Sequence, residues 1–152
     1  MVVRHLGHAG VTVGNLERSL AFYGGLLRFE ARARRVIDEP WLAQLLGLPE
    51  AVVDAIDLAV PGTGEIVQLF EFVVPRDAAT RPGMTVPGSV HLAFTVEDLD
   101  RLLARLAAAG VPLVGSPVTI TSGENTGGSL ACVRDPDGIV IEFFEAPRRS
   151  AS

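Results

Sequence analysis

An internal repeat restricts the possible folds of this 152-residue chain more than any other feature of its sequence. HAGVTVGNLERSLAFYGGLL at residues 8–27 is similar to HLAFTVEDLDRLLARLAAAG at residues 91–110, an offset of 83 residues. Further along, QLFE at residues 68–71 is similar to EFFE at residues 142–145, an offset of only 74. The first half therefore carries nine extra residues, which we place in an insertion around residues 37–49.

Each half of the sequence predicts one βαβββ module. HAGVTV and its counterpart HLAFTV are rich in small and β-branched residues, which is typical of strands. Asn15 and Asp98 each precede a stretch with apolar residues on one helical face, so each is expected to cap a helix. Later segments predict the remaining strands, at residues 30–37, 52–60, 65–73, 113–120, 128–134 and 140–145.

The two modules define the expected domain organisation and fold class. We expect a first module with its insertion at residues 1–75, a linker at 76–88, a second module at 89–147 and a tail at 148–152. One face of each predicted sheet is covered by its helix, and the other face needs a further covering layer. A pair of such modules is therefore expected to form an α+β protein with a curved sheet around a concave cleft.

Alternation along the strands predicts which side chains face this cleft. The apolar positions of the first strands are expected to cover the helices, which turns His8 and His91 to the concave side. Gln68 and Glu142, on the last strand of each half, are expected to face the same side. Trp41 of the insertion either caps the pocket or buries the insertion. Further pocket-lining residues are expected on the same strands: Thr12, Phe70, Thr95 and Phe144.

The two histidines, the amide and the carboxylate form a candidate metal site. Imidazole and carboxylate ligands together suit a divalent ion such as Zn²⁺, Fe²⁺, Mn²⁺, Co²⁺ or Ni²⁺. Four protein ligands on one side of an octahedral ion leave two adjacent positions, which suits a substrate with neighbouring oxygens. A single carboxylate leaves positive charge on the ion and its ligands, and positive charge stabilises a developing enolate oxygen.

Composition excludes several other classes of function. The net charge is −5 and no basic stripe is present, so nucleic acid is not an expected partner. No apolar run approaches the roughly 18 residues of a membrane span, and no secretory leader opens the chain, so we expect a cytoplasmic protein. All 13 basic residues are arginine, which excludes a lysine Schiff base or a lysine general base.

Four smaller expectations concern residues outside the candidate metal site. Cys132 is the only cysteine and is expected to pack as a small apolar residue. Glu71 and Glu145 match across the repeat and are expected to be solvated at strand ends. The arginines at 28, 32, 34 and 35 are expected to lie on a solvated edge strand. His5 is expected to be a surface residue beside the first strand.

The chain resembles the vicinal oxygen chelate superfamily, the family of glyoxalase, bleomycin resistance protein and dioxygenase. The resemblance rests on four segments that span nearly the whole chain: HAGVTVGNLERSLAFY, EIVQLFEF, VHLAFTVEDLD and DPDGIVIEFFE. It implies a glyoxalase-like fold, a divalent ion held by His8, Gln68, His91 and Glu142, a small-molecule substrate and a homodimer. Glyoxalase-like members carry a carboxylate at the Gln68 position, whereas epimerase-like members can carry the set found here.

Within this family the resemblance implies a metal-dependent isomerase, epimerase or lyase. Its substrate would chelate the ion through neighbouring oxygens and react through a metal-stabilised enolate, with Glu142 as the acidic group that moves a proton. One alternative is an extradiol-type non-haem Fe²⁺ dioxygenase, for which only His5 remains as an acid–base histidine. Another alternative is a metal-free drug-binding protein of the bleomycin-resistance type.

Overall fold

The computed structural model describes residues 4–77 and 83–147 of the chain. The chain divides into two compact units, residues 1–79 and 80–152. Part of the predicted linker, residues 78–82, and the predicted tail, residues 148–152, lie outside the described residues. Each unit is considered by itself below.

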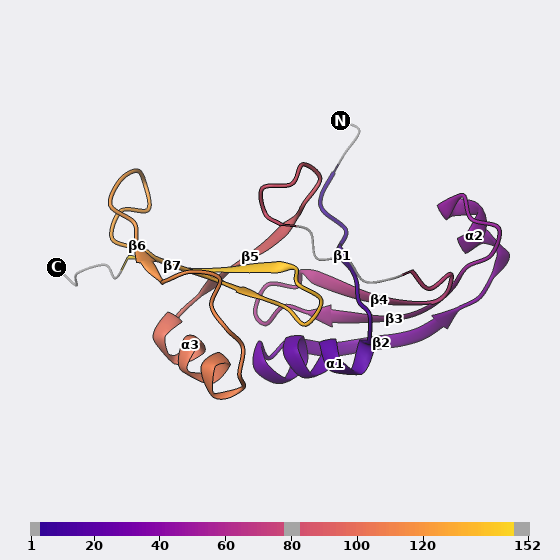
Figure 1. Ribbon diagram of the computed structural model, residues 1–152, viewed down its shortest axis with the longest axis horizontal. Helices are drawn as coiled ribbons and strands as arrows, with labels where there is room; N and C mark the ends of the chain where they lie inside the picture. The colour runs from indigo at the N-terminus through magenta and orange to yellow at the C-terminus, as the bar shows by residue number, and fades with distance from the viewer. Residues whose placement is uncertain (1–3, 78–82, 148–152) are drawn as a thin grey trace. The chain divides into compact units, whose positions relative to one another are not determined.

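The first unit is a four-stranded mixed sheet with one helix along one face (Figure 1). Its strand order is β1-β4-β3-β2, with β1 parallel to β4 and the other pairs antiparallel. Helix α1 continues directly into a π-helical segment, η1. The elements are β1 (Ala9–Thr12), α1 (Leu16–Leu20), η1 (Ala21–Leu26), β2 (Glu30–Ile37), α2 (Pro40–Leu46), β3 (Val52–Ala59) and β4 (Ile66–Val74).

The second unit repeats this arrangement without the insertion. Its strand order is β5-β8-β7-β6, with β5 parallel to β8 and the other pairs antiparallel. The elements are β5 (His91–Val96), α3 (Leu99–Ala108), β6 (Val118–Thr119), β7 (Ser129–Arg134) and β8 (Val140–Glu145). The predicted α+β class and the two βαβββ modules are therefore confirmed.

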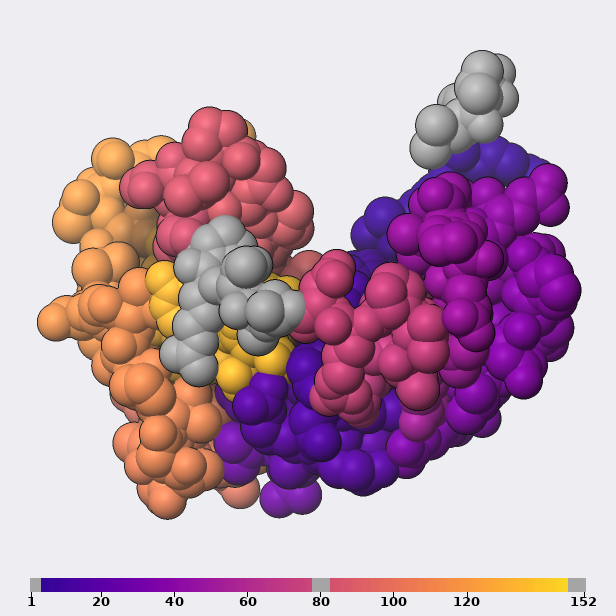
Figure 2. All heavy atoms as spheres, turned by 45° about the vertical axis from the view of Figure 1, so that its right-hand side comes forward, coloured from indigo at the N-terminus to yellow at the C-terminus, as the bar shows by residue number. Residues whose placement is uncertain are grey.

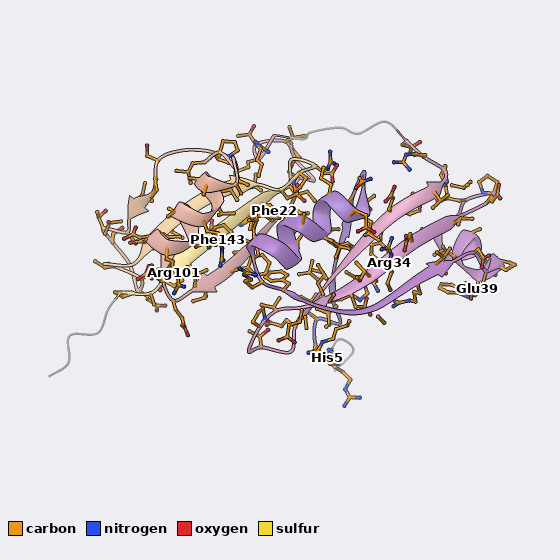
Figure 3. All side chains as sticks on the ribbon, turned by 90° about the horizontal axis from the view of Figure 1, so that it is seen from below. His5, Phe22, Arg34, Glu39, Arg101 and Phe143 are labelled. Carbon is orange, nitrogen blue, oxygen red and sulfur yellow. The ribbon has the colours of Figure 1, made fainter. Side chains whose placement is uncertain are left out.

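Each unit buries its apolar residues between the helix and one face of the sheet. In the first unit Leu16 and Tyr23 of the helical segment and Leu69 of β4 are all at most 1% exposed. Tyr23 and Leu69 have counterparts in the second unit, Leu106 of α3 and Phe143 of β8, which are 1% and 2% exposed. Figure 3 labels Phe143 in the second unit, and Phe22 on the first unit's helical segment.

One predicted strand is much shorter in the structure. Residues 113–120 were expected to form a continuous strand, but β6 covers only Val118–Thr119, and Leu113 makes one isolated bridge with Val133. The sequence in this region contains Pro112, Gly115 and Pro117. Proline has no backbone donor for the ladder and glycine weakens a strand, which explains why pairing is interrupted here.

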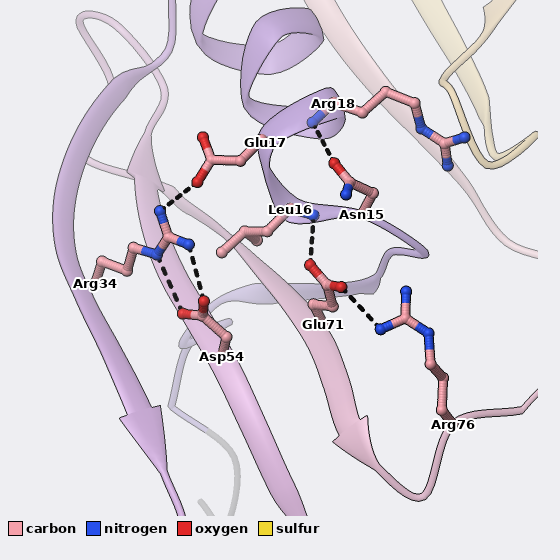
Figure 4. Close-up of polar contacts among 8 residues, drawn as sticks. All are labelled: Asn15, Leu16, Glu17, Arg18, Arg34, Asp54, Glu71 and Arg76. Atoms are coloured by element: carbon pink, nitrogen blue, oxygen red, sulfur yellow. Dashed lines mark hydrogen bonds and ion pairs between the residues drawn. The ribbon is translucent and has the colours of Figure 1, made fainter.

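The expectation that Glu71 and Glu145 are solvated is wrong. Glu71 Oε2 accepts a hydrogen bond of 2.7 Å from the backbone N–H of Leu16, and Glu145 Oε2 accepts one of 2.8 Å from Leu99 (Figure 4 shows the first of these). The first N–H groups of a helix have no partner within the helix, and its N-terminus attracts negative charge. The repeated glutamates therefore tie the last strand of each unit to the start of its helix.

Side-chain caps complete both helix starts. Asn15 Oδ1 accepts from the N–H of Arg18 at 2.8 Å, and Asp98 Oδ1 accepts from the N–H of Arg101 at 2.9 Å. Both caps were predicted from the sequence. Each helix thus begins at a defined residue, a few positions after the first strand of its unit.

The insertion forms α2, which packs through one buried side chain. Helix α2 begins with Pro40 and ends before Gly47, whose φ of 67° is the left-handed conformation of a helix C-terminus. Leu42 is 8% exposed and packs with Val53 and Ala55 of β3. The insertion lies at the surface of the first unit, in the purple region of Figure 2. Through Leu42, α2 covers part of the sheet face opposite α1.

Candidate functional site

Each sheet has one face toward its helix and an opposite face, which we call the open face. Glu71 and Glu145 contact the helix starts, so they mark the helix-side face of β4 and β8. Side chains alternate along a strand, so residues one or three positions away lie on the other face. Gln68 and Phe70 of β4, and Glu142 and Phe144 of β8, are therefore on the open faces.

The four predicted ligands occupy equivalent register positions in the two units. Gln68 lies opposite Gly10 in the β1–β4 ladder, and Glu142 lies opposite Ala93 in the β5–β8 ladder. His8 precedes Gly10 by two residues, just as His91 precedes Ala93 by two. Residues two apart on a strand share a face. Each unit thus brings one histidine and one amide or carboxylate side chain onto its open face.

Gly10 creates the space between His8 and Phe70. The ring centroids of His8 and Phe70 are 6.4 Å apart. A Cβ atom at Gly10 would lie 3.0 Å from the Phe70 ring and 4.0 Å from the His8 ring. Glycine at this position therefore lets both rings extend over the β1 backbone. Thr12, a predicted pocket residue, lies opposite Phe70 and is exposed.

Gln68 is held by a neighbour on β3. It is 7% exposed and lies directly opposite Asp57 in the β3–β4 ladder. The Gln68 side-chain nitrogen donates a hydrogen bond to Asp57 Oδ1. The other oxygen of Asp57 accepts from Arg35 at 3.2 Å. The Gln68 side-chain oxygen is therefore the atom of this amide that is left to bind a cation.

In the second unit, Glu142 and two predicted pocket residues lie together. A pocket of about 300 Å³ is lined by Thr95, Glu142 and Phe144, with Leu130 of β7 and Asn125 of the loop before it. The side chains combine one carboxylate, two neutral polar groups and apolar surface. Such a mixture is typical of sites that bind small molecules.

Cys132 is the ladder partner of Glu142 and is half-buried. Burial, together with the charge of Glu142, raises the pKa of the Cys132 thiol above its ordinary value. The thiol therefore stays protonated at neutral pH and is a poor nucleophile. This agrees with the expectation that Cys132 packs as a small side chain.

Two other predicted residues lie apart from these pairs. Trp41 is 52% exposed on α2, where Leu42 provides the buried contact of the insertion. His5 is exposed on the segment before β1, and its ring nitrogen Nδ1 lies 3.2 Å from the backbone oxygen of Leu6 (Figure 3). Strand β2 is an exposed edge strand that carries Arg32, Arg34 and Arg35, as predicted, whereas Arg28 lies before the strand begins.

The predicted ligands come as two pairs, His8 with Gln68 and His91 with Glu142. Within residues 4–77 and 83–147, no three His, Cys, Asp or Glu side chains form a metal-binding cluster. Asp57 was not among the site residues expected from the sequence, because its place depends on how β3 pairs with β4. The turn at 60–65 fixes the register of this hairpin, and that register places Asp57 opposite Gln68.

Comparison with known proteins identifies the family. The profile of the Glyoxalase/Bleomycin resistance protein/Dioxygenase superfamily matches residues 5–143, and the chain belongs to this superfamily. It is 27% identical over 143 residues to a 2-epi-5-epi-valiolone epimerase from Actinomyces, covering 92% of this chain and 78% of the relative.

No helix of the described parts of the chain is long and apolar enough to cross a membrane.

Solved structures of this superfamily share the fold. A glyoxalase family protein from Bacillus cereus superimposes with a TM-score of 0.83 at 24% identity, covering 97% of this chain and 99% of that one. The fosfomycin resistance protein FosX from Listeria monocytogenes, complexed with Mn(II) and sulfate, gives a TM-score of 0.64 at 16% identity, covering 95% and 94%. The glyoxalase-like fold expected from the sequence is therefore confirmed.

Proposed function

We propose that this protein is a divalent-metal-dependent isomerase, with epimerisation as the favoured reaction, acting on a small substrate with neighbouring oxygens. The observation that carries the proposal is the matched register of the two pairs, His8 with Gln68 and His91 with Glu142. In this proposal the two pairs together hold a single ion, which is Zn²⁺, Fe²⁺, Mn²⁺, Co²⁺ or Ni²⁺. The Mn(II) in FosX and the activity named for the Actinomyces relative support it.

The donor set fits such an ion. Two imidazoles, an amide oxygen and a carboxylate are ligands that these metals accept. Gln68 offers its oxygen because its nitrogen is engaged by Asp57. When bound, a divalent ion stabilises negative charge that develops on a substrate oxygen. With Glu142 as its only carboxylate ligand, the set leaves the ion positively charged.

The residues of the second unit have defined tasks in this proposal. Glu142 would accept a proton from the carbon next to the substrate carbonyl, and a proton from water would then return to the opposite side of that carbon to complete the epimerisation. Thr95 and Asn125 donate or accept hydrogen bonds that orient the substrate's oxygen groups. Phe144 and Leu130 cover its apolar carbon skeleton.

Metal analysis of the purified protein tests the proposal. We expect about one tightly bound divalent ion per pair of units, and we expect His91→Ala to abolish tight binding while the fold persists. Deuterium from D₂O should enter α-hydroxy ketones used as probe compounds. A folded wild-type protein that binds no divalent ion contradicts the proposal and supports the metal-free drug-binding alternative. Oxygen uptake with catechols in place of deuterium exchange supports the dioxygenase.

A mixing experiment determines whether the two pairs come from one chain or from two chains of a homodimer. Chains carrying His8→Ala are unfolded and refolded together with chains carrying His91→Ala. A site shared between two chains regains its four ligands in half of the sites of a mixed dimer. A site within one chain regains none, since every chain then lacks one ligand. Bound metal per dimer distinguishes the two arrangements.

A further inference from the structure

We propose that Asp57 is a positioning residue that fixes the Gln68 amide with its oxygen toward the metal ion. The inference rests on the proposed function, because it concerns one ligand of the proposed ion. It assigns a role to a carboxylate that is not itself a ligand. The contacts that carry it are the hydrogen bond from Gln68 to Asp57 and the ion pair from Arg35 to Asp57.

The chemistry of the carboxylate decides which way the amide points. An amide side chain has a donating nitrogen and an accepting oxygen, and reversing it exchanges the two. An ionised carboxylate only accepts hydrogen bonds, so Asp57 pairs with the Gln68 nitrogen and repels its oxygen. Gln68 is 7% exposed and lies directly opposite Asp57. Asp57 therefore excludes the orientation in which Gln68 would present its NH₂ group to a cation.

Arg35 gives Asp57 a supporting role rather than a catalytic one. Gln68 binds Asp57 Oδ1, and Arg35 Nη1 donates to Asp57 Oδ2 at 3.2 Å, so both carboxylate oxygens are engaged. A carboxylate with both oxygens engaged is poorly placed to take a proton from a substrate. Arg35 also offsets the charge of Asp57, so Gln68 is oriented without a second negative charge being added beside the ion.

The alternative is that Asp57 only stabilises the β3–β4 hairpin. A purely structural role predicts lower stability but unchanged metal affinity. A positioning role predicts lower metal affinity even in a well-folded variant, because groups that orient metal ligands typically contribute about 10–100-fold to affinity. Affinity of the metal-free protein for Mn²⁺ or Zn²⁺, measured by competition with a chelator, therefore distinguishes the two roles.

The decisive variant is Asp57→Asn, with Asp54→Asn as its matched control. Asp54 is the other aspartate of β3, and it forms an ion pair of 2.8 Å with Arg34 on the helix-side face. We expect Asp57→Asn to weaken metal binding about 10–100-fold and Asp54→Asn to leave it unchanged. Equal affinity of folded Asp57→Asn and wild-type protein overturns the inference, while the proposed function stands.

A second variant restores the fixed orientation by exchanging the two groups. In Asp57→Asn with Gln68→Glu, the amide on β3 donates to the carboxylate on β4, and the total charge of the pair is unchanged. Because Gln68→Glu itself introduces an anionic ligand, the reference for this double variant is Gln68→Glu alone, in which Asp57 offers no donor to hold the new carboxylate. We expect the double variant to bind metal at least as tightly as Gln68→Glu, although it carries one negative charge fewer. A folded double variant that binds metal more weakly than Gln68→Glu contradicts the inference. This comparison also serves if Asp57→Asn alone folds poorly.

A measurement without metal separates this inference from the proposed function. The side-chain NH₂ protons of Gln68 should exchange slowly with water in the metal-free protein, because one is donated to Asp57 and the group is buried. We expect Asp57→Asn to accelerate this exchange in NMR spectra. Unchanged exchange contradicts the inference. If the wild-type protein binds no metal but Asp57→Asn still accelerates the exchange, Asp57 does hold the Gln68 amide. Only the proposed role of Gln68 as a metal ligand is then wrong.

Discussion

The two units have the same strand order and helix caps, but their open faces are different. In the first unit the position opposite the predicted amide ligand Gln68 holds Asp57, and α2 covers part of the face through Leu42. In the second unit the position opposite Glu142 holds Cys132, and the face carries an open pocket of about 300 Å³. Each unit therefore has one carboxylate in this ladder pair, but on different strands.

Under the proposed function, this difference gives the two units different tasks. The framework residues are the same in both units: a glutamate at the helix start, an Asn or Asp cap, and a histidine, which directly precedes β1 in the first unit and begins β5 in the second. The first unit fixes a neutral group with a salt-bridged carboxylate, whereas the second places its carboxylate beside the pocket. The proposed site, with one charged ligand and a pocket beside that ligand, would bind an asymmetric substrate in a single orientation.

The largest expected effect is a loss of stability at α2, the helix that covers part of the first open face. Leu42→Ala removes the buried contact of the insertion, and Leu→Ala substitutions in cores cost about 2–5 kcal/mol. Because Leu42 is 8% exposed, we expect a loss near 2–3 kcal/mol, the lower part of the roughly 2–5 kcal/mol range, centred on α2. Hydrogen exchange should be faster in α2 and unchanged in β5 to β8.

Leu45→Ala is the matched control for this prediction. Leu45 lies on the same helix and is 73% exposed, so its replacement should change stability by less than about 0.5 kcal/mol. If both variants have the same effect, Leu42 does not anchor the insertion. The first open face is then as accessible as the second, and the contrast between the units is lost.

An intermediate effect tests the shared framework. Glu71→Gln and Glu145→Gln each keep an acceptor at the helix start but remove its charge, which should cost about 1 kcal/mol in the free energy of unfolding. Glu71 also pairs with Arg76 at 3.1 Å, so its replacement should cost up to about 1 kcal/mol more. Chemical denaturation measures both variants.

Glu124→Gln, on an exposed loop, is the control for these charge changes. If Glu71→Gln or Glu145→Gln changes the free energy of unfolding no more than Glu124→Gln does, that glutamate does not stabilise its helix start. If Glu71→Gln lowers the free energy of unfolding and Glu145→Gln does not, this contact stabilises only the first unit. The two units would then differ in their framework as well as in their open faces.

The repeat made most of the fold predictable. The duplicated motifs predicted the succession of strands and helix along each half, the caps at Asn15 and Asp98, and the place of the insertion. The length of strand 113–120 was overestimated, because its apolar residues outweighed Gly115, which weakens a strand, and Pro117, which lacks a backbone donor. The role of Glu71 and Glu145 was missed, since a glutamate at a strand end is solvated unless a helix start lies within reach.

The candidate site was predictable only as far as local alternation extends. His8, Gln68, His91 and Glu142 each followed from position within a strand. Asp57 did not, because its contact with Gln68 depends on the register between β3 and β4 and not on either strand alone. The pocket residue Asn125 comes from a loop, where no periodicity indicates the direction of a side chain.

The smallest expected effect tests the counterpart of Asp57. Cys132 occupies the position opposite Glu142, but its raised pKa keeps the thiol neutral, and a thiol is a weak hydrogen-bond donor. We therefore expect Cys132→Ala to change metal affinity by less than about threefold, well below the roughly 10–100-fold expected of Asp57→Asn. Its free energy of unfolding should fall by about 1 kcal/mol, as is usual for a point substitution. Chelator competition on Cys132→Ala and Asp57→Asn side by side gives the comparison. A loss of affinity at Cys132 as large as at Asp57 would mean that both ladder partners position ligands. The proposed difference between Gln68, which a neighbour orients, and Glu142, which needs no such neighbour, would then be wrong.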